Sequence, residues 1–258
     1  MDMVGIYDCY GGMENWGLIT FDMIDLLYEK GKSTIDVEFR IAETVNHELA
    51  HQWFGNYCTL DFWDSLWLNE SFATYMSWKC CDHFHPEWRI WEKFVGKSLQ
   101  GALRMDSWRS SHPIEIKITR ADEVSQIFDS ICYQKGPAVL RMLADWLGDA
   151  NFIKGVSLYL KKHAWSNAKT SALWNALSQV SGKDVESIMK IWTECVGYPL
   201  VTVKEEDGNI SIEQHRFIRA GDVRSEDDKA LFPIFIGLRI ENSIDNSIIV
   251  KSRSSKLS

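Results

Sequence analysis

The sequence predicts an α+β fold, in which a few strands come first, mostly helices follow, and strands return near the C-terminal end. Three observations support this order. Short alternating segments flank Gly11 and Gly12, apolar residues recur at helical spacing from Ile41 to about residue 197, and β-branched residues return beyond Tyr198. We therefore expect two units, over residues 1–197 and 198–258.

The first unit is expected to open with strands over residues 3–7 and 16–21. Residues 35–39 are expected to form a loop or a short strand. A helix should begin at Ile41, because apolar residues then recur at every fourth position, and Gly55 should end it. The residues that carry this spacing are Ile41, Val45, Leu49 and Trp53.

Helical patterns dominate the rest of the first unit. The expected helices cover about residues 69–82, 86–105, 132–147, 150–163, 170–181 and 184–196. A loop over residues 107–120 separates the second helix of this group from the third, with a brief strand where Ile114, Ile116 and Ile118 alternate. In the second unit, strands are expected over residues 200–203, 210–213 and 234–240.

Composition limits the kinds of partner. The chain of 258 residues is 45% hydrophobic and 25% charged, with a formal net charge of −8 and a pI near 5.4. An acidic chain without a basic stripe is a poor candidate for binding nucleic acid. No apolar run approaches the ~18 residues that a membrane span needs. Six scattered cysteines without a C-x-x-C pair predict reduced thiols and a cytoplasmic protein.

One short motif carries most of the chemical information. His47-Glu48-Leu49-Ala50-His51 is an H-E-x-x-H on the first expected helix. Four residues correspond to about 400° of rotation, so both imidazoles lie on one helix face, one turn apart. This spacing suits two ligands of one Zn²⁺, and Glu48 lies where a general base for the attacking water is expected. The other histidines are expected to be structural: His83, His85, His112, His163 and His215.

A hydrolytic zinc site needs a third protein ligand. Metzincins place a third histidine six residues after the second, but Tyr57 occupies that position. A carboxylate from a neighbouring helix is the remaining option. Glu70 fits, because it opens the next helix, where the helix dipole favours an acid. Asp61 and Asp64, in the connecting loop, remain alternatives.

With these residues in place, the sequence resembles the gluzincin zinc aminopeptidases, of the puromycin-sensitive or alanyl type. Eighteen residues separate His51 from Glu70, which lies in W-L-N-E-S-F-A. Residues 10–17 are similar to the family's G-x-M-E-N motif, and residues 127–136 to its Y-x-K-G segment. The resemblance implies a thermolysin-like catalytic domain over 1–197 that lacks its first strands, and the start of a β-sandwich, cut short, over 198–258.

The resemblance also implies a role for each matched residue. One Zn²⁺ would be held by His47, His51 and Glu70, while Glu48 and Tyr133 would be catalytic, with Tyr133 stabilising the tetrahedral intermediate. The substrate would be bound by Gly11, Gly12, Met13, Glu14 and Asn15, with Glu14 on the free α-amino group. The implied activity is hydrolysis of the N-terminal peptide bond by a zinc-activated water, in peptide catabolism.

Two departures keep alternatives open: Gly12 in the G-x-M-E-N motif, and a chain that is expected to be shorter at both ends than members of the family. Gly12 replaces the usual Ala of G-x-M-E-N, as in a branch that also opens epoxides, although Phe128 occupies a position where that branch has a second Tyr. The competing interpretations are therefore a bifunctional epoxide hydrolase, a non-catalytic zinc-binding or interaction fragment, and a thermolysin-type endopeptidase. The endopeptidase would not need Glu14.

Tryptophan is unusually frequent, with 12 in the chain. Trp16, Trp53 and Trp67 lie within or beside the three motifs. We expect them to form the walls of a dry zinc cleft.

Overall fold

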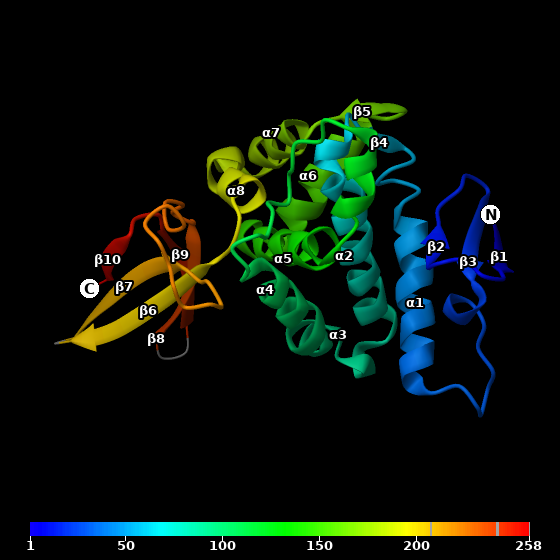
Figure 1. Ribbon diagram of the computed structural model, residues 1–258, viewed down its shortest axis with the longest axis horizontal. Helices are drawn as coiled ribbons and strands as arrows, with labels where there is room; N and C mark the ends of the chain where they lie inside the picture. The colour runs from blue at the N-terminus through cyan, green and yellow to red at the C-terminus, as the bar shows by residue number, and fades with distance from the viewer. Residues whose placement is uncertain (207, 241–242, 258) are drawn as a thin grey trace.

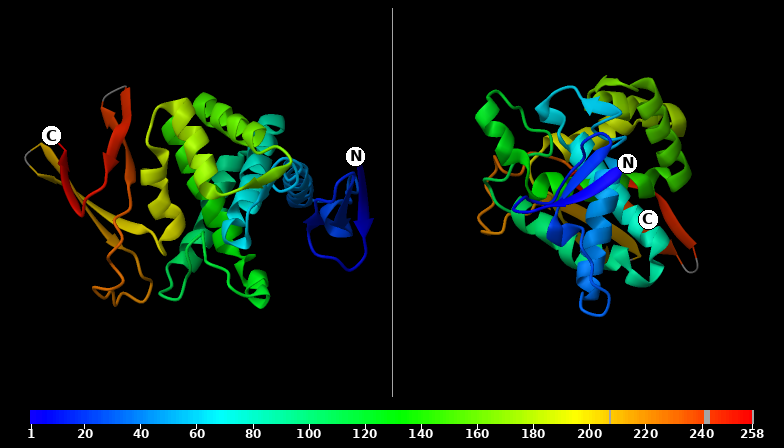
Figure 2. Two further views of the ribbon diagram at one scale, coloured as in Figure 1. Left: turned by 90° about the horizontal axis from the view of Figure 1, so that it is seen from above. Right: turned by 90° about the vertical axis from the view of Figure 1, so that its right-hand side faces the viewer.

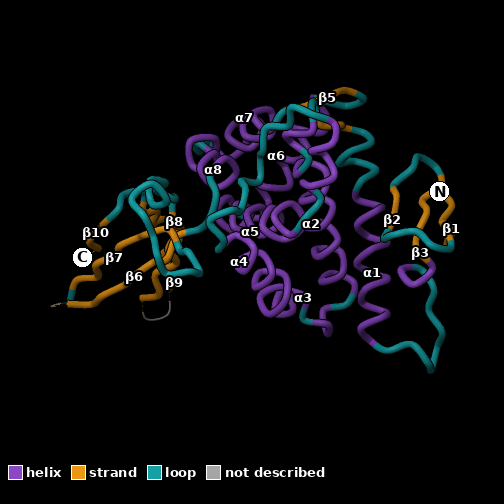
Figure 3. The backbone as a smooth tube through the Cα atoms, viewed as in Figure 1, coloured by secondary structure: helices purple, strands orange, loops and turns teal. Residues whose placement is uncertain are grey.

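The computed structural model describes residues 1–206, 208–240 and 243–257. A small sheet at the N-terminus, a helical body and a strand-rich region at the C-terminal end follow one another along the long axis (Figure 1). Figure 2 shows the same succession from two further directions, and Figure 3 shows that most strands lie at the two ends of the molecule. The predicted mixture of helix and sheet is therefore confirmed.

The N-terminal sheet has three strands in the order β1-β3-β2. Strand β1 (Asp2–Ile6) runs parallel to β3 (Leu18–Asp22), whereas the short β2 (Gly12–Met13) pairs antiparallel with β3. The alternation in β3 buries Ile19 and Phe21 completely. Because β2 is an edge strand, the side away from β3 is available to another chain. Strand β2 also lies against helix α1 (Figure 1).

Helix α1 (Ile35–Ala50) begins earlier than the sequence suggested. The expectation of a loop or short strand over residues 35–39 is wrong. Thr34 is the N-cap residue, and its Oγ1 accepts a hydrogen bond from the N–H of Val37 at 3.4 Å. Asp36 and Glu38 in the first turn are favoured by the helix dipole. These local signals at the helix start outweigh the weak apolar pattern of the segment.

Helix α2 (Trp67–Phe84) lies beside α1 and runs through the main core (Figure 1). Its first turns are buried on nearly all sides, and the Phe72 ring stacks on the rings of Phe54 and Phe152. The remaining helices of the body are α3 (Ile90–Lys93), α4 (Gln100–Asp106), α5 (Gly136–Leu147), α6 (Asp149–Lys162), α7 (Thr170–Ser181) and α8 (Val185–Glu194).

Two π-helical segments interrupt the expected regularity. Phe94–Leu99 joins α3 to α4, and Ile131–Lys135 leads directly into α5. Such segments shift a side chain out of α-helical register and are frequent at functional sites. The apolar spacing of the sequence predicts ordinary α-helix at both positions.

The prediction of a strand at Ile114–Ile118 is also wrong. Its backbone is used by other partners, since Asp64 Oδ1 accepts from the N–H of Ile118 at 2.8 Å and the carbonyl of Thr193 accepts from Glu115 at 2.8 Å. A parallel pair that was not predicted, β4 (Cys58–Leu60) with β5 (Ser166–Ala168), lies elsewhere. Three-residue strands carry too little periodicity to be recognised.

The strands at the C-terminal end form two small sheets. One contains β6 (Pro199–Glu206), β7 (Asn209–Arg216) and β10 (Ser254–Leu257), and the other contains β8 (Ile234–Ile240) and β9 (Ser243–Val250). A small cluster of Ile212, Ile234 and Val250 is buried between them. Trp192 of α8 donates a hydrogen bond to the carbonyl of Pro233 at 3.0 Å and so ties this region to the helical body.

Two further properties are the character of the helices and the state of the cysteines. Within the described ranges, none of the helices has both the length and the apolar character needed to cross a bilayer. All six cysteines are free, in agreement with the expectation of unpaired thiols.

Candidate metal centre

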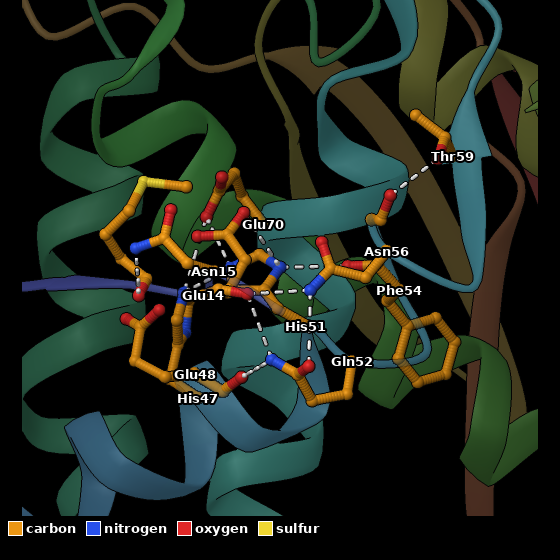
Figure 4. Close-up of polar contacts among 12 residues, drawn as sticks. Glu14, Asn15, His47, Glu48, His51, Gln52, Phe54, Asn56, Thr59 and Glu70 are labelled. Atoms are coloured by element: carbon orange, nitrogen blue, oxygen red, sulfur yellow. Dashed lines mark hydrogen bonds and ion pairs between the residues drawn. The ribbon is translucent and has the colours of Figure 1, made fainter. Parts of the chain in front are cut away.

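The two helices α1 and α2 bring three predicted ligands together. His47 and His51 lie on one face of α1, and Glu70 lies in the first turn of α2. His51 Nε2 is 3.0 Å from His47 Nε2, and Glu70 Oε2 is 3.3 Å from each of these nitrogens (Figure 4). Ligands about 2.0–2.1 Å from a tetrahedral zinc stand about 3.3 Å from one another. The donor triangle therefore has the size that one zinc ion requires.

Outer hydrogen bonds orient both imidazoles. His51 Nδ1–H donates to the carbonyl of Phe54 at 2.8 Å, and His47 Nδ1 pairs with Thr74 Oγ1 at 3.2 Å. These bonds leave the Nε2 atoms facing Glu70, which is the usual arrangement of metal-ligating histidines. In a second grouping, made by Glu14, Glu48 and His51, the His51 atom paired with Glu14 is Nδ1, at 4.0 Å, and this nitrogen already donates to Phe54. The triangle with Glu70 is therefore the better metal site.

Glu70 supplies the negative charge of the triangle, which holds a proton on His51 that a bound metal ion would displace. Burial lowers the pKa of His47. Burial opposes the charge on His51 too, but its hydrogen bond to Glu70 and the Glu70 charge outweigh this and raise the pKa of His51 to about 9. For Glu70, burial is outweighed by hydrogen bonds from His47 and His51, which hold the pKa of that carboxyl well below its usual range. Glu70 is thus an anionic ligand at any physiological pH.

Glu48 lies beside the triangle without belonging to it. It is 4% exposed, and its Oε2 has no hydrogen-bond partner among the described residues. Because burial of an unpaired carboxylate oxygen is costly, Glu48 is suited to accept a proton or a hydrogen bond from a ligand. Burial raises the pKa of Glu48 to about 8, which suits a group that must take up a proton near neutral pH. A Cβ at Gly12 would overlap the Glu48 side chain, so the glycine allows β2 this close approach.

Glu14 directly follows β2 and lies beside His51. Its Oε1 is 4.0 Å from His51 Nδ1, and the side chain is 19% exposed. The amides of Gln52 and Asn56 donate hydrogen bonds to the Glu14 carbonyl at 3.1 and 2.7 Å (Figure 4). These two residues were missed by the sequence analysis. Their four-residue spacing just beyond the end of α1 is the signal that could have found them, but nothing local shows that they hold Glu14.

The other predicted substrate-binding residues divide into two groups. Gly11 and Gly12 line a cleft of about 480 Å³ that also contains His47, Glu48 and Tyr133. Met13 is 47% exposed, and Asn15 is an exposed residue whose side-chain amide donates to the Met13 carbonyl at 3.4 Å. The side chains of Met13 and Asn15 do not line this cleft.

Tyr133 reaches the same cleft from the π-helical turn Ile131–Lys135. Its ring lies 6.1 Å from the His47 ring. Burial, followed by the negative charge of Glu70, raises the pKa of Tyr133 well above its ordinary value. Tyr133 therefore remains a neutral O–H donor, as stabilisation of an oxyanion requires.

A buried ion pair fixes the turn that carries Tyr133, and the sequence analysis did not foresee it. Lys135 Nζ is 2.7 Å from Asp106 Oδ2, with side-chain exposures of 7% and 2%. Both partners also bind the backbone of Gly197, because Lys135 donates to its carbonyl at 3.1 Å and Asp106 Oδ1 accepts from its N–H at 2.9 Å. The turn is thus tied to α4 and to the start of the strand-rich region.

Further contacts hold the start of the turn. His112 Nε2 pairs with Asp129 Oδ2 at 2.8 Å, and Asp129 Oδ1 accepts from the N–H of Ile131 at 2.8 Å. Ser71 Oγ also donates to the Cys132 carbonyl at 2.7 Å. His112 therefore has the structural role expected of it.

The alternative third ligands lie away from the triangle. Asp64 accepts from the backbone of Ile118, and Asp61 pairs with Lys169 at 3.6 Å. Neither belongs to a group that could hold a metal ion among the described residues. Glu70 is the carboxylate that the fold brings to the two histidines.

The expected tryptophan walls are wrong. Trp67 is fully buried in the core, where its Nε1 donates to Thr170 Oγ1 at 3.1 Å. Trp16 stacks on Trp165 with 5.5 Å between ring centroids, and Trp53 is 54% exposed. The tryptophan that lines the cleft is Trp78. Proximity in sequence to a motif did not predict the direction of a side chain.

Comparisons with known proteins agree with this geometry. A family model described as the Peptidase family M1 domain matches residues 1–192. The chain is 52% identical to "Aminopeptidase 2, mitochondrial" of Saccharomyces cerevisiae, over 98% of this chain and 27% of that protein. It is 52% identical to the alanine/arginine aminopeptidase of the same yeast (98% and 30%) and 44% identical to the leucyl aminopeptidase of Saccharolobus solfataricus (95% and 30%).

The chain thus spans less than a third of the length of these relatives. The family match covers the N-terminal sheet, α1, α2 and the turn that carries Tyr133. Identities of this size over nearly the whole chain leave no doubt about common ancestry. The chain belongs to peptidase family M1.

Proposed function

We propose that this chain carries the catalytic centre of a zinc aminopeptidase, with one Zn²⁺ held by His47, His51 and Glu70. The observation that carries the proposal is the buried triangle of donor atoms, 3.0–3.3 Å on each side. The names of the relatives support peptides as the substrates. When bound, zinc supplies a Lewis acid that polarises the scissile carbonyl and lowers the pKa of water.

Each residue near the triangle has a task in this proposal. Glu48 takes a proton from the attacking water and passes it to the leaving amine, a contribution of roughly 10²–10⁴-fold. Tyr133 donates its O–H to the developing oxyanion. Gly11 and Gly12 bring the edge of β2 next to the substrate backbone. Main-chain pairing along such an edge would hold the peptide in an extended conformation.

Glu14 makes the enzyme an exopeptidase. Its carboxylate lies next to His51, where it can pair with the amino group of the substrate. A carboxylate that pairs with an ammonium group away from bulk water forms a strong charge-assisted contact. Gln52 and Asn56 fix the backbone of Glu14 and therefore fix the distance from the amino group to the first peptide bond.

We further propose that residues 1–197 form a thermolysin-like catalytic domain and that residues 198–258 begin a β-sandwich. The end of the family match at residue 192 and the two small sheets beyond it support this division. A cytoplasmic location is supported by the six free cysteines.

The test compares peptides with free and acetylated N-termini. The purified chain should cleave alanyl-coumarin and Ala-Leu peptides, lose this activity to a chelator, and leave N-acetylated peptides intact. Glu48→Gln should keep one zinc per chain by metal analysis and lose turnover. Equal cleavage of the acetylated peptides would indicate an endopeptidase, and bound zinc without any turnover would indicate a binding fragment.

A further inference from the structure

The face of α1 that carries the metal ligands continues one turn toward its N-terminus. Glu43, His47 and His51 are spaced at i, i+4 and i+8, so they share this face. His51 lies next to Glu14, at the end where the proposed function places the substrate's amino group. A peptide that starts at Glu14 and crosses the metal site must therefore continue toward Glu43.

The distances suit the second residue of the peptide. One helical turn rises about 5.4 Å, and an extended peptide rises about 3.3 Å per residue. The Cα atom that follows the cleaved bond therefore lies beside His47, and only a long side chain can reach one turn further along α1, to Glu43. The cleft of about 480 Å³ extends to this place, since its lining includes Glu43, Ser77 and Trp78 as well as His47.

Glu43 gives this end of the cleft an uncompensated negative charge. Its Oε1 accepts a hydrogen bond from Trp78 Nε1 at 2.7 Å, which fixes the carboxylate. Within the described parts of the chain, Glu43 forms no ion pair with a lysine, arginine or histidine. The residues that line the cleft include no lysine or arginine. A partly buried carboxylate without a cationic partner favours a cation supplied by a ligand.

We propose that Glu43 makes the enzyme prefer peptides with lysine or arginine as the second residue, the first residue of the leaving group. This inference rests on the proposed function. The cationic head of the side chain pairs with Glu43, and its aliphatic stem lies along the cleft wall. An acidic second residue is disfavoured by like charge. Because the contact is present before and during bond cleavage, it acts mainly on KM and leaves kcat nearly unchanged.

The test uses three peptides that differ only at the second position, Ala-Lys, Ala-Leu and Ala-Glu followed by the same neutral tail. The wild-type chain should show kcat/KM for Ala-Lys roughly 5–20-fold above Ala-Leu, with Ala-Glu lowest. Glu43→Gln keeps an oxygen acceptor for Trp78 and removes the charge, so the Ala-Lys to Ala-Leu ratio should fall to about one. The matched control Glu186→Gln, at an exposed position of α8, should keep the wild-type ratio.

The outcomes separate the two proposals. A wild-type chain that cleaves none of the three peptides, despite bound zinc, overturns the proposed function and this inference with it. Cleavage of all three at similar rates, or a Glu43→Gln variant that keeps the wild-type ratio, overturns the inference alone. Salt provides a second readout, because the wild-type preference should shrink at high ionic strength and the Glu43→Gln ratio should not change.

Discussion

Replacing Lys135 by Met should test whether the buried ion pair with Asp106 holds the turn that carries Tyr133. Methionine has a similar length and apolar stem but cannot bind the carboxylate. The substitution removes the ammonium group 2.7 Å from Asp106 Oδ2, and the Asp106 side chain, which is 2% exposed, then has no cationic partner. The backbone N–H of Gly197 still donates to Asp106 Oδ1, so the carboxylate is not left entirely without partners.

The expected cost follows from this burial. Removing one partner of a buried pair typically destabilises a protein by about 3–5 kcal/mol, because the remaining charge stays desolvated. For a chain of this size, that loss corresponds to a melting temperature lower by roughly 6–20 °C. Lys190→Met is the matched control, because its pair with Glu194 is 3.6 Å long and both side chains are about half exposed. The control should cost about 0.5 kcal/mol or less.

Urea unfolding followed by tryptophan fluorescence and by circular dichroism measures these free energies. The double variant Lys135→Met with Asp106→Leu removes both charges and should recover most of the loss, because no ion then remains buried. A cost below about 1 kcal/mol for Lys135→Met would refute the reasoning. The reasoning would also be refuted if the double variant lost as much stability as Lys135→Met and Asp106→Leu lose separately in sum, because the two charges would then not interact.

Three further changes concern the same turn and its surroundings. Tyr133→Phe should lower kcat by about 10²–10³-fold at unchanged zinc content, as an oxyanion donor requires, and unchanged kcat on alanyl-coumarin would exclude that role. Gly136→Ala should cost about 1–3 kcal/mol in urea unfolding, because the new methyl group would overlap the Ser71 side chain, and Ser71→Gly should restore much of it. The hydrogen bond to Asp129 raises the pKa of His112, so its stabilisation is complete below the unfolded-state pKa of about 6.5 and is lost as pH rises through the higher folded-state value. The stability difference between the wild type and His112→Asn should therefore shrink from pH 6 to pH 9, and a constant difference would contradict the ion pair.

Some features could be read from the sequence because they depend on neighbours along one helix. The H-E-x-x-H spacing alone places His47 and His51 on one face of α1, whatever the rest of the fold does. The apolar pattern located α7 at Thr170–Ser181 and β8 at Ile234–Ile240 with the bounds that the structure has. Short-range periodicity is a local property, so a single sequence contains it.

Other features were missed or misplaced because they depend on competition between local signals. The start of α1 is decided by the Thr34 cap, and the apolar pattern that was used to predict it begins six residues later. The segment around Ile118 alternates like a strand, but Asp64 accepts a hydrogen bond from its backbone, and no strand of the described residues pairs with it. Periodicity predicts an element only when hydrogen-bond partners are present.

The sequence by itself determined the two histidines, the glutamate between them that we propose as general base, and the class of metal that they suit. Residue spacing left Glu70, Asp61 and Asp64 open as third ligands and the family resemblance implied Glu70, but only the packing of α2 against α1 shows that Glu70 lies against the two histidines. Only the tertiary structure shows the hydrogen bond from the Gln52 amide to the Glu14 carbonyl, because it joins residues 38 positions apart. Such contacts depend on where separate elements come to lie, and helical spacing says nothing about the distance between two elements.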